Sequence, residues 1–151
     1  MGLTPRVTRV ADDLMPYEAT SFPAFRYRDV LEETWEDSDL LSRVEYMLFL
    51  PVSGRTKATP QGDCTFGLPR FWRPSAADLE LIRKEWELYR IEIERGLADR
   101  LTPASETVAI HVRPHGRDAQ DTDDAPGVGP LVKKSFWLNR SFVAQILRRE
   151  R

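Results

Sequence analysis

Hydrophobic and polar residues follow a helical period over one long segment of the chain. Between Ser75 and Pro103, apolar side chains return every three or four positions. This spacing predicts an amphipathic helix of about seven turns whose apolar face packs in the core. Ser75 and Asp78 have the separation of a capping box, so the helix should begin directly after Ser75. The residues of the apolar stripe are Leu79, Ile82, Trp86, Tyr89, Ile93 and Leu97.

Three other segments have the patterns of β-strands. Residues 40–52 contain a near-continuous apolar run, which is typical of a strand buried on both faces. Residues 106–113 alternate and stop at a proline; Val108, like the isoleucine and valine that follow it, should face one side, and Arg113 the other. Residues 131–138 predict a further strand, in which Phe136 and Leu138 share a face and should lie in the core.

The remaining segments complete one domain over residues 1–151. Residues 20–27 are rich in aromatic side chains and fit the edge of a sheet. Residues 29–38 are compatible with an acidic surface helix. Residues 116–130 are polar and rich in glycine and proline, which predicts a mobile loop. Residues 141–149 fit a short closing helix. The pattern as a whole indicates a fold with both helices and strands.

Charge is unevenly distributed along the chain. The net charge is -2, but residues 29–45 hold seven acids against Arg43, and residues 133–151 hold six bases against Glu150. A chain polarised in this way can present a cationic face to phosphate. Two ordinary solvated faces explain the same pattern, and charge alone favours that interpretation.

Several classes of protein are excluded or disfavoured by composition. Cys64 is the only cysteine, which rules out an internal disulfide and favours a reducing compartment. The N-terminus lacks the apolar core of a signal peptide, and no apolar run approaches the length of a membrane span. We therefore expect a cytoplasmic protein without a membrane partner.

Known catalytic and metal motifs are missing from the sequence. His111 and His115 are four residues apart, but they lie on a strand that runs into a proline, so we expect no metal site there. We expect a hydrogen-bonded strand residue at His111 and a loop residue at His115. No aspartate is followed by Glu-x-Lys, the carboxylate and lysine set of many Mg²⁺-dependent nucleases. We therefore predict no catalytic or metal-binding residues in this chain.

Arginine and aromatic residues near the C-terminus favour contact with nucleic acid. Arg113 ends a strand on its polar face, where it can read a guanine or pair with a nearby acid. Trp137 should point away from the core beside Asn139 and Arg140, an arrangement that suits a DNA groove. Asn139 can meet an adenine edge or a phosphate. Burial of Trp137 as a second core residue remains the alternative.

Five pieces of the chain, in order, resemble the MutH family, which groups a mismatch-repair nicking endonuclease with restriction enzymes that cut at GATC. The pieces span residues 34 to 142. They are TWEDS (34–38), the strand 47–52, FWRP (71–74) ahead of a helix with EWE (85–87), HVRP (111–114) and FWLNRSF (136–142). The resemblance implies a restriction-endonuclease-like fold, with a mixed sheet flanked by helices and a DNA cleft between two lobes.

The resemblance also implies roles for individual residues. Arg113 and Pro114 would lie on the segment that reads the GATC bases, and Trp137 would sit beside the adenine whose methylation is sensed. Arg43 would fall near a family lysine that approaches the active site. Lys133, Lys134 and Arg140 are expected to hold phosphate. The full set expected to bind DNA is Arg113, Pro114, His115, Arg117, Lys133, Lys134, Trp137, Asn139 and Arg140.

The chain departs from the family where catalysis is concerned. Leu3-Thr4-Pro5 resembles the residues that follow Glu-x-Lys in some members, which places the catalytic lysine near Gly2 and the acids before Met1. We therefore expect an N-terminally truncated domain, with the family's Mg²⁺ bound only in a complete enzyme. Arg117 and Asp118 also replace family residues, so a GATC preference is an inference.

Three functions follow as hypotheses. The first is the recognition part of a mismatch-repair or restriction endonuclease, which binds double-stranded DNA and cuts only with a missing N-terminal segment or a second subunit. The second is a catalytically inactive regulatory DNA-binding module. The third is a protein-interaction module with no DNA role. For the first two, the expected location is the cytoplasm, at the nucleoid when DNA is bound.

Overall fold

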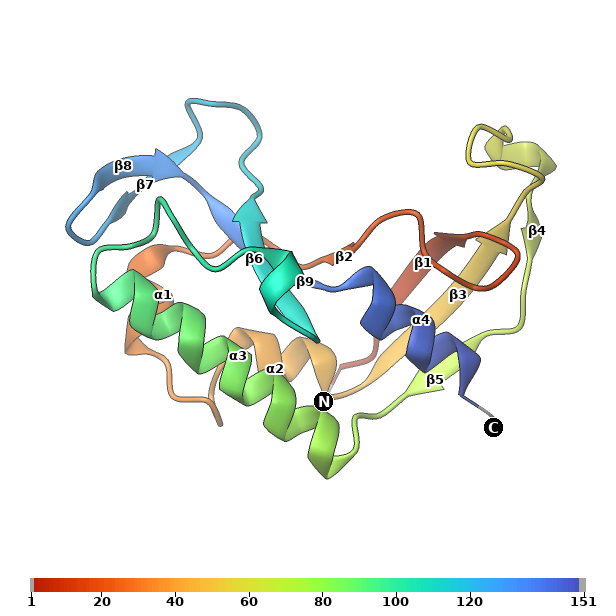
Figure 1. Ribbon diagram of the computed structural model, residues 1–151, viewed down its shortest axis with the longest axis horizontal. Helices are drawn as coiled ribbons and strands as arrows, with labels where there is room; N and C mark the ends of the chain where they lie inside the picture. Colours follow the sequence, from red (N-terminus) through yellow and green to blue (C-terminus); the bar gives the residue numbers. More distant parts are fainter. Residues whose placement is uncertain (1, 150–151) are drawn as a thin grey trace.

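The fold places helices around two separate small sheets and a hairpin (Figure 1). The computed structural model describes residues 2–149. Its elements are β1 (Thr4–Val10), β2 (Thr20–Ser21), α1 (Tyr27–Glu32), α2 (Asp39–Val44), β3 (Met47–Ser53), β4 (Thr65–Phe66), β5 (Arg70–Trp72), α3 (Ala76–Glu94), β6 (Ile110–Pro114), β7 (Thr122–Ala125), β8 (Gly129–Val132), β9 (Lys134–Leu138) and α4 (Arg140–Arg148), with short 3-10 turns at Gln61–Asp63 and Ala104–Glu106.

Both parallel and antiparallel pairs build these sheets. In the four-stranded sheet, β3 pairs in parallel with β1 and antiparallel with β4 and β5. A second sheet has the antiparallel order β2-β9-β6, and β7 and β8 form a separate hairpin. In Figure 1, α3 crosses beside β6 and β9, whereas α4 lies beside β1 and β3. This mixed α/β architecture confirms the predicted fold class and is consistent with a restriction-endonuclease-like fold.

Helix α3 begins as its sequence predicts. The Ser75 hydroxyl accepts a hydrogen bond from the Asp78 amide (3.1 Å), and the Asp78 carboxylate accepts one from the Ser75 amide (3.3 Å). The helix is shorter than predicted, because it has 19 residues and ends at Glu94. Gly96 follows with a φ of +78°, a conformation that favours glycine and stops the helix before Leu97. Its buried apolar residues are Ile82, Trp86, Tyr89 and Ile93.

Two predicted segments divide differently in the structure. Residues 40–52 are not one strand, because Ser38 caps a helix there: its hydroxyl accepts from the Leu41 amide (3.1 Å), and α2 precedes β3. Residues 29–38 are likewise only partly helical. Residues 116–130 are not simply a loop, since they contain β7 and the turn into β8, where Gly127 and Gly129 take positive φ.

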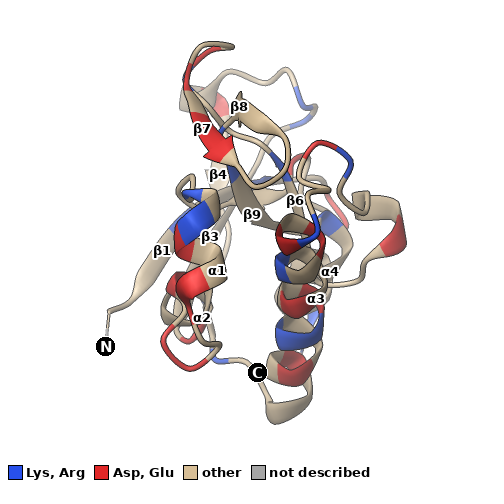
Figure 2. Cartoon of the chain, turned by 90° about the vertical axis from the view of Figure 1, so that its left-hand side faces the viewer, with Lys and Arg blue, Asp and Glu red and all other residues tan. Residues whose placement is uncertain are grey.

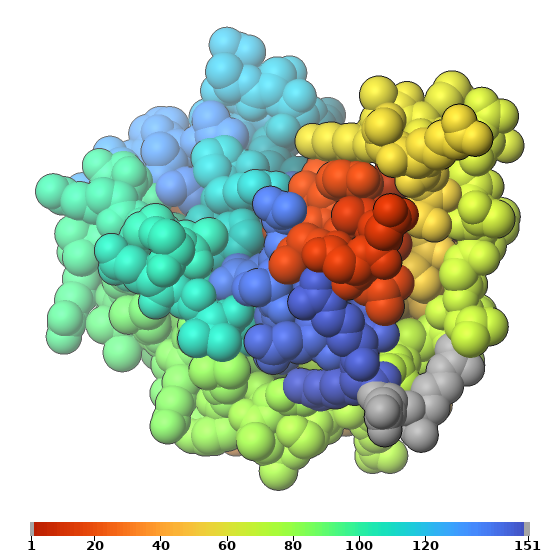
Figure 3. Space-filling model, turned by 45° about the vertical axis from the view of Figure 1, so that its right-hand side comes forward, coloured from red at the N-terminus to blue at the C-terminus, as the bar shows by residue number. Residues whose placement is uncertain are grey.

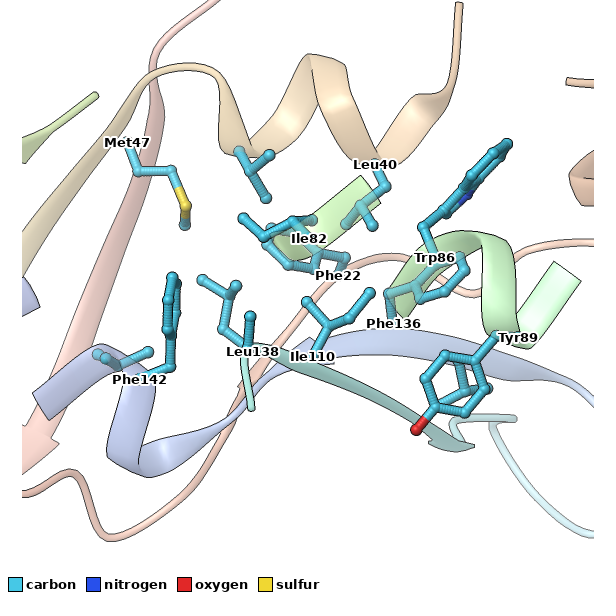
Figure 4. Close-up of a cluster of buried hydrophobic side chains, with 14 of the residues drawn as sticks. Phe22, Leu40, Met47, Ile82, Trp86, Tyr89, Ile110, Phe136, Leu138 and Phe142 are labelled. Atoms are coloured by element: carbon cyan, nitrogen blue, oxygen red, sulfur yellow. The ribbon is translucent and has the colours of Figure 1, made fainter. Parts of the chain in front are cut away.

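The core joins both sheets to α2, α3 and α4. Figure 4 shows Met47 of β3, Ile82 of α3, Phe142 of α4 and Leu138 of β9 pointing into one cluster of buried side chains. Phe136 and Leu138 are buried, as predicted. Val108 is not, with 55% of its surface exposed, because β6 begins only at Ile110.

One face of the four-stranded sheet carries apolar side chains that are not covered. Phe71 lies opposite Leu48, and Val7 lies opposite Leu50, so these residues share the face turned away from Met47 and Phe49. Val7 is 67% exposed and Phe71 60%, while Phe49 is fully buried. On the same face, Phe66 of β4 is 71% exposed. Within β3 itself, Leu48 and Leu50 are partly buried and Val52 is buried on this face, so the predicted burial of the strand on both faces is confirmed in part. We call this surface the outer sheet face.

Candidate nucleic-acid interface

Strands β6 and β9 bring the two predicted base-contacting residues together. Arg113 lies opposite Ser135, and His111 lies opposite Trp137, so Arg113 and Trp137 are diagonal neighbours on one face. The guanidinium carbon of Arg113 lies 3.7 Å from the centroid of the Trp137 ring, which is a cation–π contact. Arg113 is exposed and has no ion pair with any described acid. Its charge is therefore free to meet a ligand while its position is restrained.

Glu85 of α3 fixes the start of the strand that carries Arg113. Its carboxylate accepts hydrogen bonds from the backbone amides of Val108 (2.6 Å), Ala109 (2.6 Å) and Ile110 (3.1 Å). Glu85 is only 9% exposed, so these amides satisfy a carboxylate that is otherwise removed from water. Sequence patterns assigned Glu85 to the helix without a role, because its partners are backbone atoms of a distant strand.

His111 and Asn139 are linked beneath the exposed arginine. Nδ1 of His111 and Oδ1 of Asn139 are 2.5 Å apart, and Nδ2 of Asn139 donates to the Thr107 carbonyl (3.2 Å). Burial lowers the pKa of His111, the hydrogen bond to Asn139 opposes that shift, and the nearby Arg113 charge adds to it. A neutral His111 that donates from Nδ1 satisfies this geometry. The expectation of a hydrogen-bonded strand histidine is confirmed.

The amide of Asn139 is therefore committed to the protein itself. Asn139 is 6% exposed and both ends of its amide have partners, so the expected contact with adenine or phosphate does not fit this conformation. Trp137 is half-buried, so it is intermediate between the outward residue and the core residue that the sequence allowed. The His111 ring stacks against it with the ring centroids 6.2 Å apart, and Arg113 covers its ring. Its indole N–H is buried and has no hydrogen-bond partner among the described residues.

Lys134 does not reach phosphate in this structure. It is 8% exposed, and its ammonium donates to the Ala98 carbonyl (2.5 Å). Burial lowers the pKa of Lys134, and the charge of Asp99 opposes the shift. The position of Lys134 at the start of β9, next to the end of α3, turns its side chain inward. The expectation that Lys134 holds phosphate is corrected accordingly.

Ion pairs occupy most of the other cations of the C-terminal region. Asp121 pairs with both Lys133 (3.1 Å) and Arg117 (3.3 Å). The backbone amide of Arg117 and the Lys133 ammonium lower the pKa of Asp121 to about 2. Further along, Arg148 pairs with Asp13 (3.4 Å) and Arg149 with Asp78 (2.9 Å). The basic tail is therefore not one free cationic face.

Figure 2 shows where the charged residues lie along the described chain. Basic and acidic residues alternate along α3, and acids gather on α1, on α2 and on the segment between them. Arg43, on α2, pairs with Asp39 at 2.8 Å. It is near enough to Arg6 of β1 for the charge of Arg43 to lower the pKa of Arg6, an effect second to burial.

One cavity of about 800 Å³ gathers several of the predicted residues. Arg113, Asn139 and Arg140 line it together with His111. Arg140 is exposed, and its Nε donates to the Pro16 carbonyl (2.7 Å). The side of the cavity that sequence analysis missed is formed by Met15, Tyr17, Glu18, Ala19, Ala104, Ser105, Thr107 and Ser141. We call the whole cavity of about 800 Å³ the reading cavity.

The remaining predicted residues lie outside this cavity. Pro114 is the last residue of β6, where it lies opposite Lys134, so the strand ends at this proline as predicted. His115 is exposed, and its Nδ1 lies 2.8 Å from the Ser135 hydroxyl. Arg117, Lys133 and Arg43 are engaged in the ion pairs described above.

Metal-ligating side chains are not clustered in the part of the chain that the structure describes. Between residues 2 and 149, no three His, Cys, Asp or Glu side chains come together in a group that could hold a metal ion. In the same part of the chain, no helix combines the length and the apolar composition required to cross a bilayer.

Comparison with known proteins identifies relatives for this chain. The family model described as "DNA mismatch repair enzyme MutH" matches residues 4–85. The DNA mismatch repair protein MutH of Vibrio vulnificus (strain YJ016) is 29% identical over 119 residues, which cover 76% of this chain and 52% of that protein. The MutH protein of Shewanella baltica (strain OS195) is 25% identical over 153 residues, covering 99% of this chain and 68% of that protein. The chain thus spans about half the length of the Vibrio relative.

Proposed function

The chain belongs to the MutH family of DNA mismatch repair enzymes, and on that premise we propose that it is the part of such an endonuclease that recognises double-stranded DNA. The proposed target is a GATC-type site. We place the bases at the reading cavity, where the exposed arginine of β6 faces solvent.

One observation carries this proposal, the restrained guanidinium of Arg113. Its guanidinium carbon lies 3.7 Å from the centroid of the Trp137 ring. Arg113 belongs to β6 and Trp137 to β9, and these two strands are paired. An arginine held in this way can donate two hydrogen bonds to the O6 and N7 of a guanine, because little freedom is lost on binding. The absence of an ion pair with a described acid leaves those donors available.

We propose that DNA cleavage requires residues beyond this chain. The sequence has no Asp followed by Glu-x-Lys, and no group of metal ligands forms within residues 2–149. A preceding segment or a second subunit would supply these residues and the family's Mg²⁺. The outer sheet face suits contact with such a polypeptide, since Phe66 and Phe71 are mostly exposed there.

Binding measurements test the recognition proposal. We expect fluorescence anisotropy to show tighter binding to a duplex with one GATC than to a duplex of the same composition in scrambled order. Arg113→Ala should reduce that preference about 5- to 150-fold, the equivalent of the roughly 1–3 kcal/mol that one bidentate base contact supplies. Arg100→Ala is the matched control, because Arg100 is 72% exposed and pairs only with the adjacent Asp99.

Three results would each contradict a part of the proposal. If wild-type protein fails to bind either duplex at low salt, recognition of DNA by this chain is wrong. If it binds both but Arg113→Ala leaves the preference unchanged, base reading is assigned to the wrong residue. Nicking of the GATC duplex by the purified 151 residues, lost on addition of a chelator, would contradict the proposed need for additional residues.

The second candidate is a protein-interaction module without a DNA role. The outer sheet face favours it, because mostly exposed aromatic side chains on one sheet are typical of a protein contact. The partner in that case is the polypeptide that completes the domain in the longer relatives. Absence of duplex binding, together with binding of that polypeptide that is lost on substitution of Phe71 in the outer sheet face, would support this candidate over the first.

A further inference from the structure

A second cavity adjoins the reading cavity and has a different lining. Its volume is about 420 Å³, and it lies along β1 between the segment 17–21 and Lys57. Tyr17, Glu18 and Ala19 line both cavities, so the two share a wall. In Figure 3 the loop around residue 57 (yellow) overhangs the N-terminal segment (red), which in turn lies against α4 (blue). We call this second cavity the cationic notch.

Three cations and a single acid line the cationic notch. Arg6, Arg9 and Lys57 have no ion pair with any described residue, and Glu18 is the only acid among the lining residues. Other arginines of the described chain are held in ion pairs, as Arg83 is with two glutamates. In a protein of net charge -2, unpaired cations gathered at one cavity mark a place where an anion is favoured.

Backbone carbonyls hold the two arginines in place. Arg6 donates to the Ser21 carbonyl (3.1 Å), and its guanidinium lies over the Phe22 ring, 5.6 Å from the centroid. Arg9 donates to the Thr59 carbonyl, and its Nε is buried without a hydrogen-bond partner among the described residues. Carbonyls orient these guanidinium groups but leave their charge uncompensated. Burial lowers the pKa of Arg6, with a further contribution from Arg43.

We propose that the cationic notch binds a phosphate group of the DNA backbone, next to the bases that the reading cavity receives. This inference rests on the proposed function, because it assigns the second contact of the same duplex. A phosphate oxygen accepts from a guanidinium fork and from a lysine ammonium, the groups that Arg6, Arg9 and Lys57 present. The contact carries no sequence information but fixes the position of the duplex relative to Arg113.

The loop offers a matched pair of variants for the test. Lys57 lines the cationic notch, whereas Arg55 is exposed in the same loop and does not line it. Each phosphate contact contributes about 0.9 to the slope of log K against log salt concentration. We expect Lys57→Gln to lower that slope by about one and to weaken binding equally for GATC and scrambled duplexes. Arg55→Gln should leave the slope close to the wild-type value.

A second variant protects the test against loss of structure. Arg6→Gln should lower the slope in the same way, and thermal denaturation shows whether each variant is folded. Arg9→Lys, which keeps the charge, should retain most of the slope. If folded Lys57→Gln and Arg6→Gln both keep the wild-type slope, the phosphate assignment is overturned.

Other outcomes separate this inference from the proposed function and from a free anion. Failure of wild-type protein to bind any duplex counts against the proposed function itself, whereas duplex binding with unchanged slopes counts only against the cationic notch. Inorganic phosphate is the probe for a free anion. If it raises the melting temperature of wild type but not of Lys57→Gln, while the salt slopes of the two proteins agree, the notch serves free phosphate and the backbone assignment is wrong.

Discussion

Arg113 and Trp137 act as a pair at the scale of single residues. Because the indole ring lies against the guanidinium at 3.7 Å, it restricts the rotamers that the arginine can adopt. The exposed cation gains orientation from a half-buried neighbour, which is the arrangement that precise base reading requires. In this structure Trp137 supports Arg113. Because the guanidinium covers one face of the indole ring, an adenine could contact Trp137 only outside that face.

The pairing predicts the effect of changing Trp137. Trp137→Leu should lower the preference for a GATC duplex about as much as Arg113→Ala, because the arginine loses its support. Trp137→Tyr should retain most of the preference, since an aromatic face remains. NMR of the free protein provides an independent check, because ring currents should move the side-chain protons of Arg113 upfield only when the aromatic ring is present. Equal preference in wild type and Trp137→Leu would contradict this role.

Asp121 supplies a prediction about pH. Its pKa is about 2 in the folded protein, below its ordinary value of 3.8, because the Arg117 amide and Lys133 favour the charged carboxylate. The stabilisation from Asp121 is therefore fully present above its ordinary pKa and is lost as the pH falls toward 2. Thermal denaturation of wild type and Asp121→Asn should differ most above about pH 4 and converge near pH 2. A difference that stays constant across this range would count against the assignment.

At the scale of elements, α3 and β6 are joined by one carboxylate. Glu85 accepts three backbone hydrogen bonds at the start of β6, so the strand that presents Arg113 is anchored to the longest helix. Charged hydrogen bonds of this kind replace the hydration that Glu85 loses on burial.

Removal of that carboxylate should destabilise the whole domain. Glu85→Ala leaves three amides near the core without an acceptor, and we expect a loss of about 2–4 kcal/mol in the free energy of unfolding. Urea denaturation measures this loss. Glu80→Ala is the control on the same helix, because Glu80 is exposed and pairs only with Arg83 on that helix. Equal effects of the two changes would show that Glu85 does not anchor β6.

At the scale of the whole molecule, the four-stranded sheet has two unlike faces. One contributes Met47, Phe49 and Trp72 to the core, and the other carries Val7 and Phe71 in contact with solvent. Apolar side chains on both faces of a sheet are typical of a sheet that is covered on both sides. The reading cavity and the cationic notch are formed by side chains near the join between this sheet and the β2-β9-β6 sheet.

The two faces predict opposite responses to substitution. Phe49→Ala should reduce the free energy of unfolding by about 3–5 kcal/mol, because it leaves a cavity in the core. Phe71→Ser should change it by less than about 1 kcal/mol and should reduce any self-association measured by sedimentation velocity. A large loss of stability in Phe71→Ser would mean that the outer sheet face is covered within this chain.

Local patterns in the chain were sufficient to predict several features. The helix after Ser75, its cap and the inward positions of Phe136 and Leu138 depend on contacts close in sequence or on simple periodicity, and the structure confirms them. The predicted stripe is buried at Ile82, Trp86, Tyr89 and Ile93, whereas Leu79 and Leu97 are only partly buried. The family was also visible in motif order. Residue types alone indicated Arg113 and Trp137 as a candidate pair, although spacing could not show that they touch.

Tertiary structure decided which candidate residues are available to a ligand. Lys134 and Asn139 have the right chemistry for DNA, but pairing of β9 with β6 and the packing of their surroundings turn both inward. The sequence predicts no role for Arg6 or for Lys57. The two cations line one cavity only because β1 and a distant loop meet in the fold. Burial and ion pairing are set by neighbours far apart in sequence. For that reason the sequence by itself determined the long helix, several of the strands and the family, whereas only the fold determined which charges remain unpaired.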